Sequence, residues 1–136
     1  MKILVIDDDP AMTDLLKLIL VSTDADVITA NSGAEGLKKT RELSPSIVIL
    51  DLMMPDKDGW QITSEIRSFS SVPILILSVI DNPGLVARAL DAGADDYLIK
   101  PAPKNELIAH INNLTRRCSA MHSNTSTVQL QAESLI

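Results

Sequence analysis

The feature that most constrains this chain is a series of short apolar runs that recur along it at regular intervals. The runs are rich in Val, Ile and Leu, and they cover residues 3–6, 27–29, 47–50, 74–77 and 97–99. Unbroken apolar runs of this length are typical of strands that are buried on both faces, as in a parallel sheet. Aromatic residues make up only 2% of the chain, so we expect an aliphatic core.

Stretches with helical spacing separate these runs. In the first, Leu15, Leu16, Ile19 and Leu20 mark one apolar face. Further helices are expected at residues 32–43, 59–69, 84–92 and about 103–117. The alternation of strand and helix predicts an α/β fold, in which a doubly wound parallel sheet has helices on both faces and right-handed crossovers.

Capping residues mark several of the expected helix ends. Asp9 followed by Pro10 suits the start of the first helix, because Asp caps the free backbone N–H groups and Pro fits the first turn. Ser32 with Glu35 three residues later forms a capping box for the second helix. Gly93 is a candidate stop for the fourth helix.

Length and composition predict one domain and exclude several classes of protein. Residues 1–117 of the 136 carry the pattern, and 118–136 are predicted to be a linker or flexible tail. The net charge of −6 argues against direct nucleic-acid binding by this chain. One cysteine allows no internal disulfide, and no apolar stretch is long enough for a membrane span. We therefore expect a cytoplasmic location and no membrane association.

Polar residues gather at the predicted carboxyl ends of the strands. Asp7, Asp8 and Asp9 follow the first strand, and Asp51 follows the third. Ser78 ends the fourth, and Lys100 ends the fifth. In a parallel sheet these ends meet at one edge, where ligands of such folds bind.

Carboxylates brought together at that edge repel each other unless a cation intervenes. Lys100 supplies one positive charge, and Mg²⁺, which prefers oxygen ligands, would supply more. Asp51 beside such a cation could attack phosphorus and form an aspartyl phosphate, with Lys100 and the Ser78 hydroxyl neutralising the phosphoryl oxygens.

Four motifs in this order resemble the receiver domain of bacterial two-component response regulators. They are LVIDDDP at residues 4–10, VILDLMMPDKDG at 48–59, PILILS at 73–78 and AGADDYLIKP at 92–101. The resemblance covers about residues 1–117. It implies a flavodoxin-like sheet of five strands in the order 2-1-3-4-5 with five helices.

The resemblance also implies a role for each matching residue. Asp51 would be the phospho-acceptor and Lys100 the partner of the phosphoryl group. Asp7, Asp8 and Asp51 would hold Mg²⁺, together with the backbone carbonyl of Met53.

Two further implied residues form the switch. Ser78 would bond to the phosphoryl group, and Tyr97 would turn inward as it does so. The phosphoryl donor would be a sensor histidine kinase. The chain would be a phospho-acceptor switch and not an enzyme beyond self-phosphorylation from small donors and slow self-dephosphorylation.

Within that family the sequence is most similar to the OmpR/PhoB group, which implies a transcriptional output and a homodimer. The dimer would form through the last two helices and the last strand. Arg88 and Glu106 are candidates to pair across a two-fold axis, and Asp95 or Asp96 could meet Arg117.

Two alternatives remain open at this point. The Asp-x-Asp spacing in Asp7–Asp9 also suits a magnesium-dependent phosphatase of the haloacid-dehalogenase type, with Asp7 as nucleophile. That interpretation leaves Asp51 without a role. A receiver that signals without phosphate would be expected to lack Asp51, the acidic pair or Lys100, and none of these is missing.

Overall fold

The computed structural model describes residues 1–123, with side chains described as far as Arg117. Five strands and five α-helices alternate along the chain, with one short 3₁₀ turn after the first helix. The strands are β1 (Lys2–Ile6), β2 (Asp26–Ala30), β3 (Ile47–Leu50), β4 (Ile74–Ser78) and β5 (Asp96–Ile99). The helices are α1 (Pro10–Leu20), α2 (Gly33–Leu43), α3 (Gly59–Arg67), α4 (Pro83–Asp91) and α5 (Lys104–Ser123), and the 3₁₀ turn is η1 (Val21–Thr23).

The five strands form one parallel sheet in the order β2-β1-β3-β4-β5. The strand order reverses next to β1, since β2 lies on one side of it and β3 on the other. The predicted fold class and strand order are therefore confirmed. All five predicted apolar runs lie within observed strands, and the ends differ by at most a residue.

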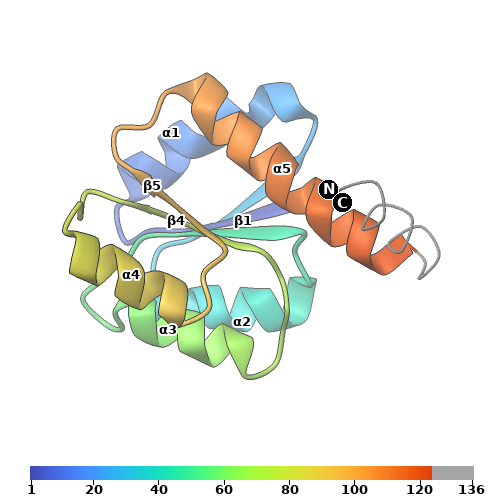
Figure 1. Ribbon diagram of the computed structural model, residues 1–136. Coiled ribbons are helices and arrows are strands. Elements are labelled where there is room, and N and C mark those ends of the chain that lie inside the picture. The colour runs from blue at the N-terminus through green and yellow to red at the C-terminus, as the bar shows by residue number, and fades with distance from the viewer. Residues whose placement is uncertain (124–136) are drawn as a thin grey trace.

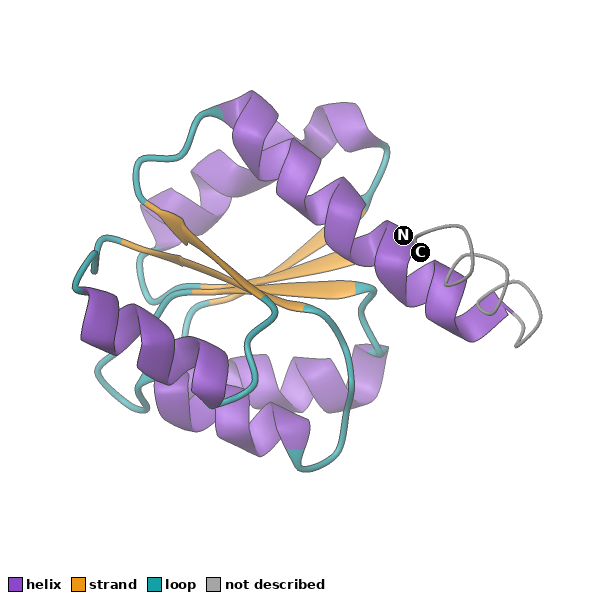
Figure 2. Cartoon of the chain, viewed as in Figure 1, coloured by secondary structure: helices purple, strands orange, loops and turns teal. Residues whose placement is uncertain are grey.

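Helices cover both faces of the sheet, as Figures 1 and 2 show. α1 and α5 lie on one face, where Leu16, Leu20, Leu107 and Ile111 are buried against alternate strand residues. α2, α3 and α4 lie on the other face (Figure 1). Because both faces are covered, strands β3 and β4 are buried at every position, which explains their unbroken apolar runs.

The predicted helix starts are confirmed by side-chain caps. Asp9 Oδ1 accepts a hydrogen bond from the backbone N–H of Ala11, and Ser32 Oγ accepts one from that of Glu35. Glu35 does not complete the capping box on Ser32, because its carboxylate accepts from the N–H of Asn31 instead. Leu15 was predicted to face the core but is 48% exposed, since the buried stripe of α1 runs through Thr13, Leu16 and Leu20.

Helix ends differ from prediction at two places. α3 ends at Arg67 and not at residue 69, and the Arg67 guanidinium donates to the carbonyls of Ser70, Val72 and Gly93, which lie outside the helix. α5 continues to Ser123, past the predicted end at Arg117. The predicted linker or tail at 118–136 thus begins inside a helix, and residues 124–136 lie outside the described part of the chain.

Among residues 1–123, no helix combines the length and apolar character needed to cross a membrane.

The close approach of α2 to β1 generates a stability prediction. A Cβ on Gly36 would lie 2.6 Å from Ile6 Cδ1, and Ile6 is fully buried. Gly36→Ala should therefore lower the free energy of unfolding by about 1–3 kcal/mol, because the helix must move away from the sheet. Urea denaturation measures the change.

Gly84→Ala is the matched control. Gly84 is exposed in the first turn of α4, and an added Cβ would approach only Asn82 Oδ1, at 3.2 Å. Its effect should stay within about 1 kcal/mol. Equal losses in both variants would show that α2 does not pack this tightly on β1.

Candidate functional site

Polar residues from four strands meet at the carboxyl edge of the sheet. Asp7 follows β1 and receives the backbone N–H of Asp9 on Oδ1 at 3.0 Å. Asp51 follows β3, Ser78 ends β4, and Lys100 follows β5. The parallel register brings these positions side by side, because Ile6 pairs with Leu50 and Ser78 pairs with Ile99. The edge predicted from the sequence is thus present.

Lys100 is the cation that links two of the carboxylates. Its Nζ lies 2.7 Å from Asp7 Oδ2 and 3.7 Å from Asp51 Oδ2. The side chain of Lys100 is mostly buried, and those of Asp7 and Asp51 are more deeply buried. An ion pair removed from water in this way interacts more strongly than one on the surface, although its desolvation opposes the gain.

Opposing influences act on the pKa of the Asp51 carboxyl, and their net effect is to raise it. Burial raises the pKa of the Asp51 carboxyl, the nearby Lys100 opposes that rise, and the negative charge of Asp7 adds to it. The backbone N–H of Met53 approaches Oδ1 at 3.4 Å and also favours the ionised form. A carboxylate held in this way gains from any further cation beside it, because a cation favours the charged form.

The three carboxylates that were predicted to hold a metal ion lie together. One oxygen each from Asp7, Asp8 and Asp51 falls within 4.8 Å of the other two. Asp8 is exposed, whereas Asp7 and Asp51 are buried, so the cluster opens to solvent on the Asp8 side. The Met53 side chain is 56% exposed and lies in the loop that follows Asp51. An acidic cluster with one open side suits an oxygen-preferring cation that keeps some of its water.

The predicted switch pair lies beside this cluster. Ser78 is fully buried, and its Oγ accepts from the N–H of Ile80 at 3.3 Å. The Tyr97 hydroxyl donates to the carbonyl of Ile80 at 2.6 Å. Burial raises the pKa of the Tyr97 hydroxyl, and the nearby Ser78 hydroxyl opposes that shift. Ile80 therefore contacts both members of the pair.

Two residues near the site were not singled out from the sequence. The Asn31 side-chain amide donates to the Asp7 carbonyl at 2.9 Å and to Thr13 Oγ1 at 3.1 Å, which ties the turn after β1 to the start of α2. Asp56, in the loop after β3, accepts from the backbone N–H groups of Gly33 and Ala34. No spacing pattern marks either contact, because both join segments far apart in the sequence.

The residues predicted to build a dimer face are partly engaged within the chain. Asp95 binds Arg67 at 2.7 Å, and Asp96 binds His110. The Arg88 guanidinium lies over the Trp60 ring, 4.9 Å from its centroid. Glu106 and Arg117 are exposed. Asp95 and Asp96 would have to exchange these partners before meeting Arg117 of a second copy.

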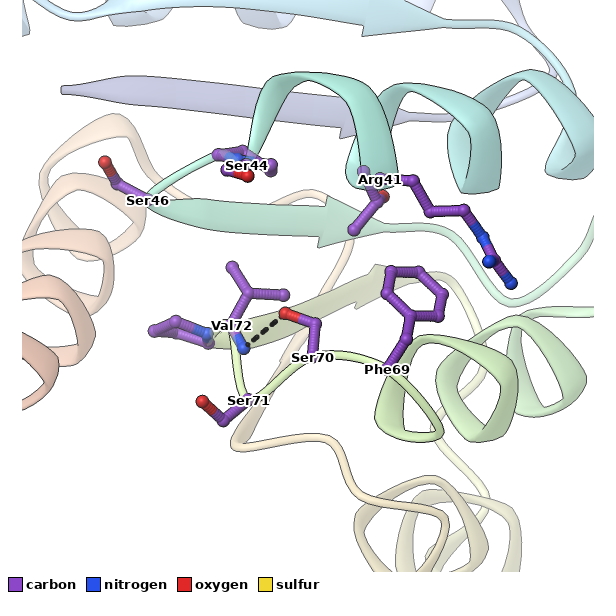
Figure 3. Close-up of a pocket in the computed structure, with 10 residues that line it drawn as sticks. Arg41, Ser44, Ser46, Phe69, Ser70, Ser71 and Val72 are labelled. Atoms are coloured by element: carbon purple, nitrogen blue, oxygen red, sulfur yellow. Dashed lines mark hydrogen bonds between the residues drawn. The ribbon is translucent and has the colours of Figure 1, made fainter.

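A separate pocket lies at the opposite edge of the sheet, where β3 and β4 begin (Figure 3). It encloses about 310 Å³, and Arg41 is the one charged residue in its lining. Arg41 stacks on Phe69, 4.2 Å from the ring centroid, and Ser70 Oγ accepts from the N–H of Val72. The lining of this pocket contains no carboxylate and none of the residues of the acidic cluster, so the pocket is separate from that site.

Comparison with known proteins identifies the family. The model of the response regulator receiver domain matches residues 3–112, which include every residue of the acidic cluster as well as Ser78, Tyr97 and Lys100.

Two curated relatives are longer than this chain and carry the names of DNA-binding or transcriptional regulators. The DNA-binding response regulator MtrA of Mycolicibacterium smegmatis is 37% identical over 116 residues, which cover 85% of this chain and 51% of MtrA. The CpxR homologue of Haemophilus influenzae, a transcriptional regulatory protein, is 40% identical over 129 residues, which cover 95% of this chain and 56% of the relative. The chain thus spans about half the length of these relatives. They are of the OmpR/PhoB type, in agreement with the sequence motifs.

Solved structures show the same fold. A two-component response regulator from Clostridium difficile superposes with a TM-score of 0.84 at 31% identity, covering 90% of this chain and 99% of that one. The BeF3-activated receiver domain of RstA from Klebsiella pneumoniae gives a TM-score of 0.82 at 30% identity, covering 85% and 99%.

The phosphatase alternative is not supported, because the receiver model matches the whole edge and Asp7 is engaged by Lys100 as one member of it. The carboxylate cluster, the strand order and these relatives agree, and the chain belongs to the response regulator receiver domain family.

Proposed function

We propose that Asp51 takes a phosphoryl group from a phosphohistidine of a partner sensor kinase, in a magnesium-dependent reaction, and that the change controls a transcriptional output. The observation that carries the proposal is the position of Asp51. Its carboxylate is buried among Asp7, Asp8 and Lys100 at the edge of a receiver fold. The names of the relatives, which are DNA-binding or transcriptional regulators, support the output.

The proposed reaction is a displacement at phosphorus. An oxygen of the Asp51 carboxylate forms a bond to phosphorus while the bond from phosphorus to the imidazole nitrogen breaks. The electron pair of that bond stays on the nitrogen, which takes up a proton. Such a transfer depends mainly on positioning and charge neutralisation. Lys100, already 3.7 Å from Asp51 Oδ2, would neutralise a phosphoryl oxygen.

The donor set fits Mg²⁺, since Asp7, Asp8 and Asp51 offer clustered carboxylate oxygens and Asp8 is open to water. We assign these three residues and the Met53 backbone carbonyl as its protein ligands. When bound, Mg²⁺ would supply positive charge for the phosphoryl oxygens.

Ser78 and Tyr97 are proposed to read the phosphorylated state. The Ser78 hydroxyl, now bonded to the N–H of Ile80, would turn to a phosphoryl oxygen. Tyr97 holds the carbonyl of the same residue, so a shift of Ile80 would reach the surface of α4 and β5 through the Tyr97 ring. A homodimer through α4, β5 and α5 is proposed as the consequence, with exposed Glu106 and Arg117 among its contacts.

Asp51→Asn should abolish phosphorylation, because the amide is a poor nucleophile toward phosphorus. Intact mass spectrometry after incubation with acetyl phosphate and Mg²⁺ measures the product. Wild type should gain one phosphoryl group. Asp58→Asn is the control, because Asp58 only caps α3 through the N–H of Gln61 and Asn caps equally well. Labelling that persists in Asp51→Asn would contradict the assignment.

Asp8→Asn should weaken Mg²⁺ binding by at least about tenfold, the scale on which even outer partners of metal ligands act. Isothermal calorimetry of the unphosphorylated protein measures the affinity directly. Asp9→Asn is the matched control from the same turn, since Asp9 caps α1 and Asn preserves the cap. Equal affinities in the two variants would remove Asp8 from the ligand set.

A further inference from the structure

The loop between β3 and α3 is tied to the start of α2 by one side chain. Asp56 Oδ1 accepts the backbone N–H of Gly33 at 3.0 Å, and Oδ2 accepts that of Ala34 at 3.1 Å. Asp56 lies shortly after Asp51 and Met53 in the sequence, whereas its two partners lie on a different helix. The carboxylate therefore joins the loop that carries the phospho-acceptor to a rigid element.

The hydrogen bonds from Gly33 and Ala34 to Asp56 form because these two residues stand at the start of α2. The first N–H groups of α2 have no partner within the helix, and the helix dipole favours negative charge there. Ser32 satisfies the N–H of Glu35, and Asp56 satisfies those of Gly33 and Ala34. The bond from Gly33 is the main cause that lowers the pKa of the Asp56 carboxyl.

Glycine at residue 33 leaves room for the β3–α3 loop to approach the start of α2. A Cβ on Gly33 would lie 2.8 Å from Ile62 Cδ1, 3.0 Å from Lys57 Cβ and 3.3 Å from Asp56 Oδ2. Any side chain at residue 33 would push the loop away from α2. Glycine at this position and aspartate at residue 56 therefore act together.

Two other side chains of the loop, Leu52 and Met54, are buried in the core and anchor it to the face of the sheet. Met53, Pro55 and Asp56 are exposed, and the backbone N–H of Met53 is 3.4 Å from Asp51 Oδ1. Lys57 binds Glu65 on α3 at 3.2 Å, and the N–H of Gly59 binds the carbonyl of Leu52 at 2.8 Å. Asp56 supplies the hydrogen bonds that tie the loop to α2.

We propose that Asp56 is a positioning residue, which holds the β3–α3 loop so that Asp51 and the Met53 carbonyl keep the geometry needed to bind Mg²⁺. The inference rests on the proposed function, because it assumes that these groups are magnesium ligands. Asp56 acts through the loop and touches neither the metal nor the phosphoryl group.

Two variants of Asp56 and a matched control test the proposal. Asp56→Ala removes both bonds to α2, and Asp56→Asn keeps one carbonyl oxygen as an acceptor. Ser32→Ala removes the other cap of the same helix without touching the loop. The measurements are calorimetric Mg²⁺ titration and hydrogen exchange of loop residues 52–58 in metal-free protein. Urea midpoints report any general loss of stability.

Asp56→Ala should weaken Mg²⁺ binding about tenfold and speed exchange in the loop, because the groups after β3 are no longer held in place. A loss of about tenfold is the lower end of what removing a group that supports a metal ligand costs. Asp56→Asn should fall between it and wild type. Ser32→Ala should lower the urea midpoint as much as Asp56→Ala does, yet keep Mg²⁺ affinity within about twofold of wild type, because a lost cap costs helix stability alone.

Other outcomes overturn the proposal. Equal losses of affinity in Asp56→Ala and Ser32→Ala would reduce Asp56 to a helix cap. Unchanged Mg²⁺ affinity in Asp56→Ala would do the same, even if loop exchange rose. Failure of wild type to bind Mg²⁺ would refute the metal site of the proposed function and the positioning role with it. If wild type binds Mg²⁺ and only the variants lose affinity, the proposed function stands.

Discussion

Electrostatic repulsion among carboxylates at one edge of the sheet is the constraint around which the candidate site is arranged. Asp7, Asp8 and Asp51 place oxygens within 4.8 Å of one another. Two like charges 4 Å apart repel by about 4 kcal/mol at an effective dielectric constant of 20. Lys100 offsets part of this repulsion by binding Asp7 and lying close to Asp51. The fold therefore maintains a cluster in which three carboxylates face one nearby ammonium group.

The apolar packing of the sheet keeps these carboxylates together despite their repulsion. Strands β3 and β4 are buried along their whole length, and the helices on both faces fix them in register. The apolar contacts hold Asp51 and Ser78 at adjacent strand ends, whatever the charges there favour. The burial that stabilises the sheet also removes Asp51 from water and raises its pKa, so the packing of the core sets the electrostatics of the site.

The loops at this edge connect the site to two parts of the surface. Ile80 is bonded to both Ser78 and Tyr97, and the loop after Asp51 is held to α2 by Asp56. One side of the site therefore leads to α4 and β5, while the other is anchored. An arrangement with one anchored and one responsive side allows a local charge change to bias a distant surface.

The sequence by itself determined the elements and the polar residues that gather at one edge of the sheet. Unbroken apolar runs predicted the strands to within a residue, because a strand that is buried on both faces needs apolar residues at successive positions. Asp51, Ser78 and Lys100 were found from their places at strand ends, and topology alone brings such ends together. The last turn of α3 and the exposure of Leu15 were missed, since these depend on contacts of Arg67 and on the packing of α1.

Only the tertiary structure decided the contacts that hold the site in shape. Asn31 on Asp7, Asp56 on Gly33, and the pairing of Asp95 with Arg67 each join distant segments. A hydrogen bond of this kind depends on how two loops approach each other, and loop approach follows from the packing of the helices behind them. The spacing of apolar residues indicates which face of a helix or strand is buried, but it does not indicate which loop lies opposite a given side chain.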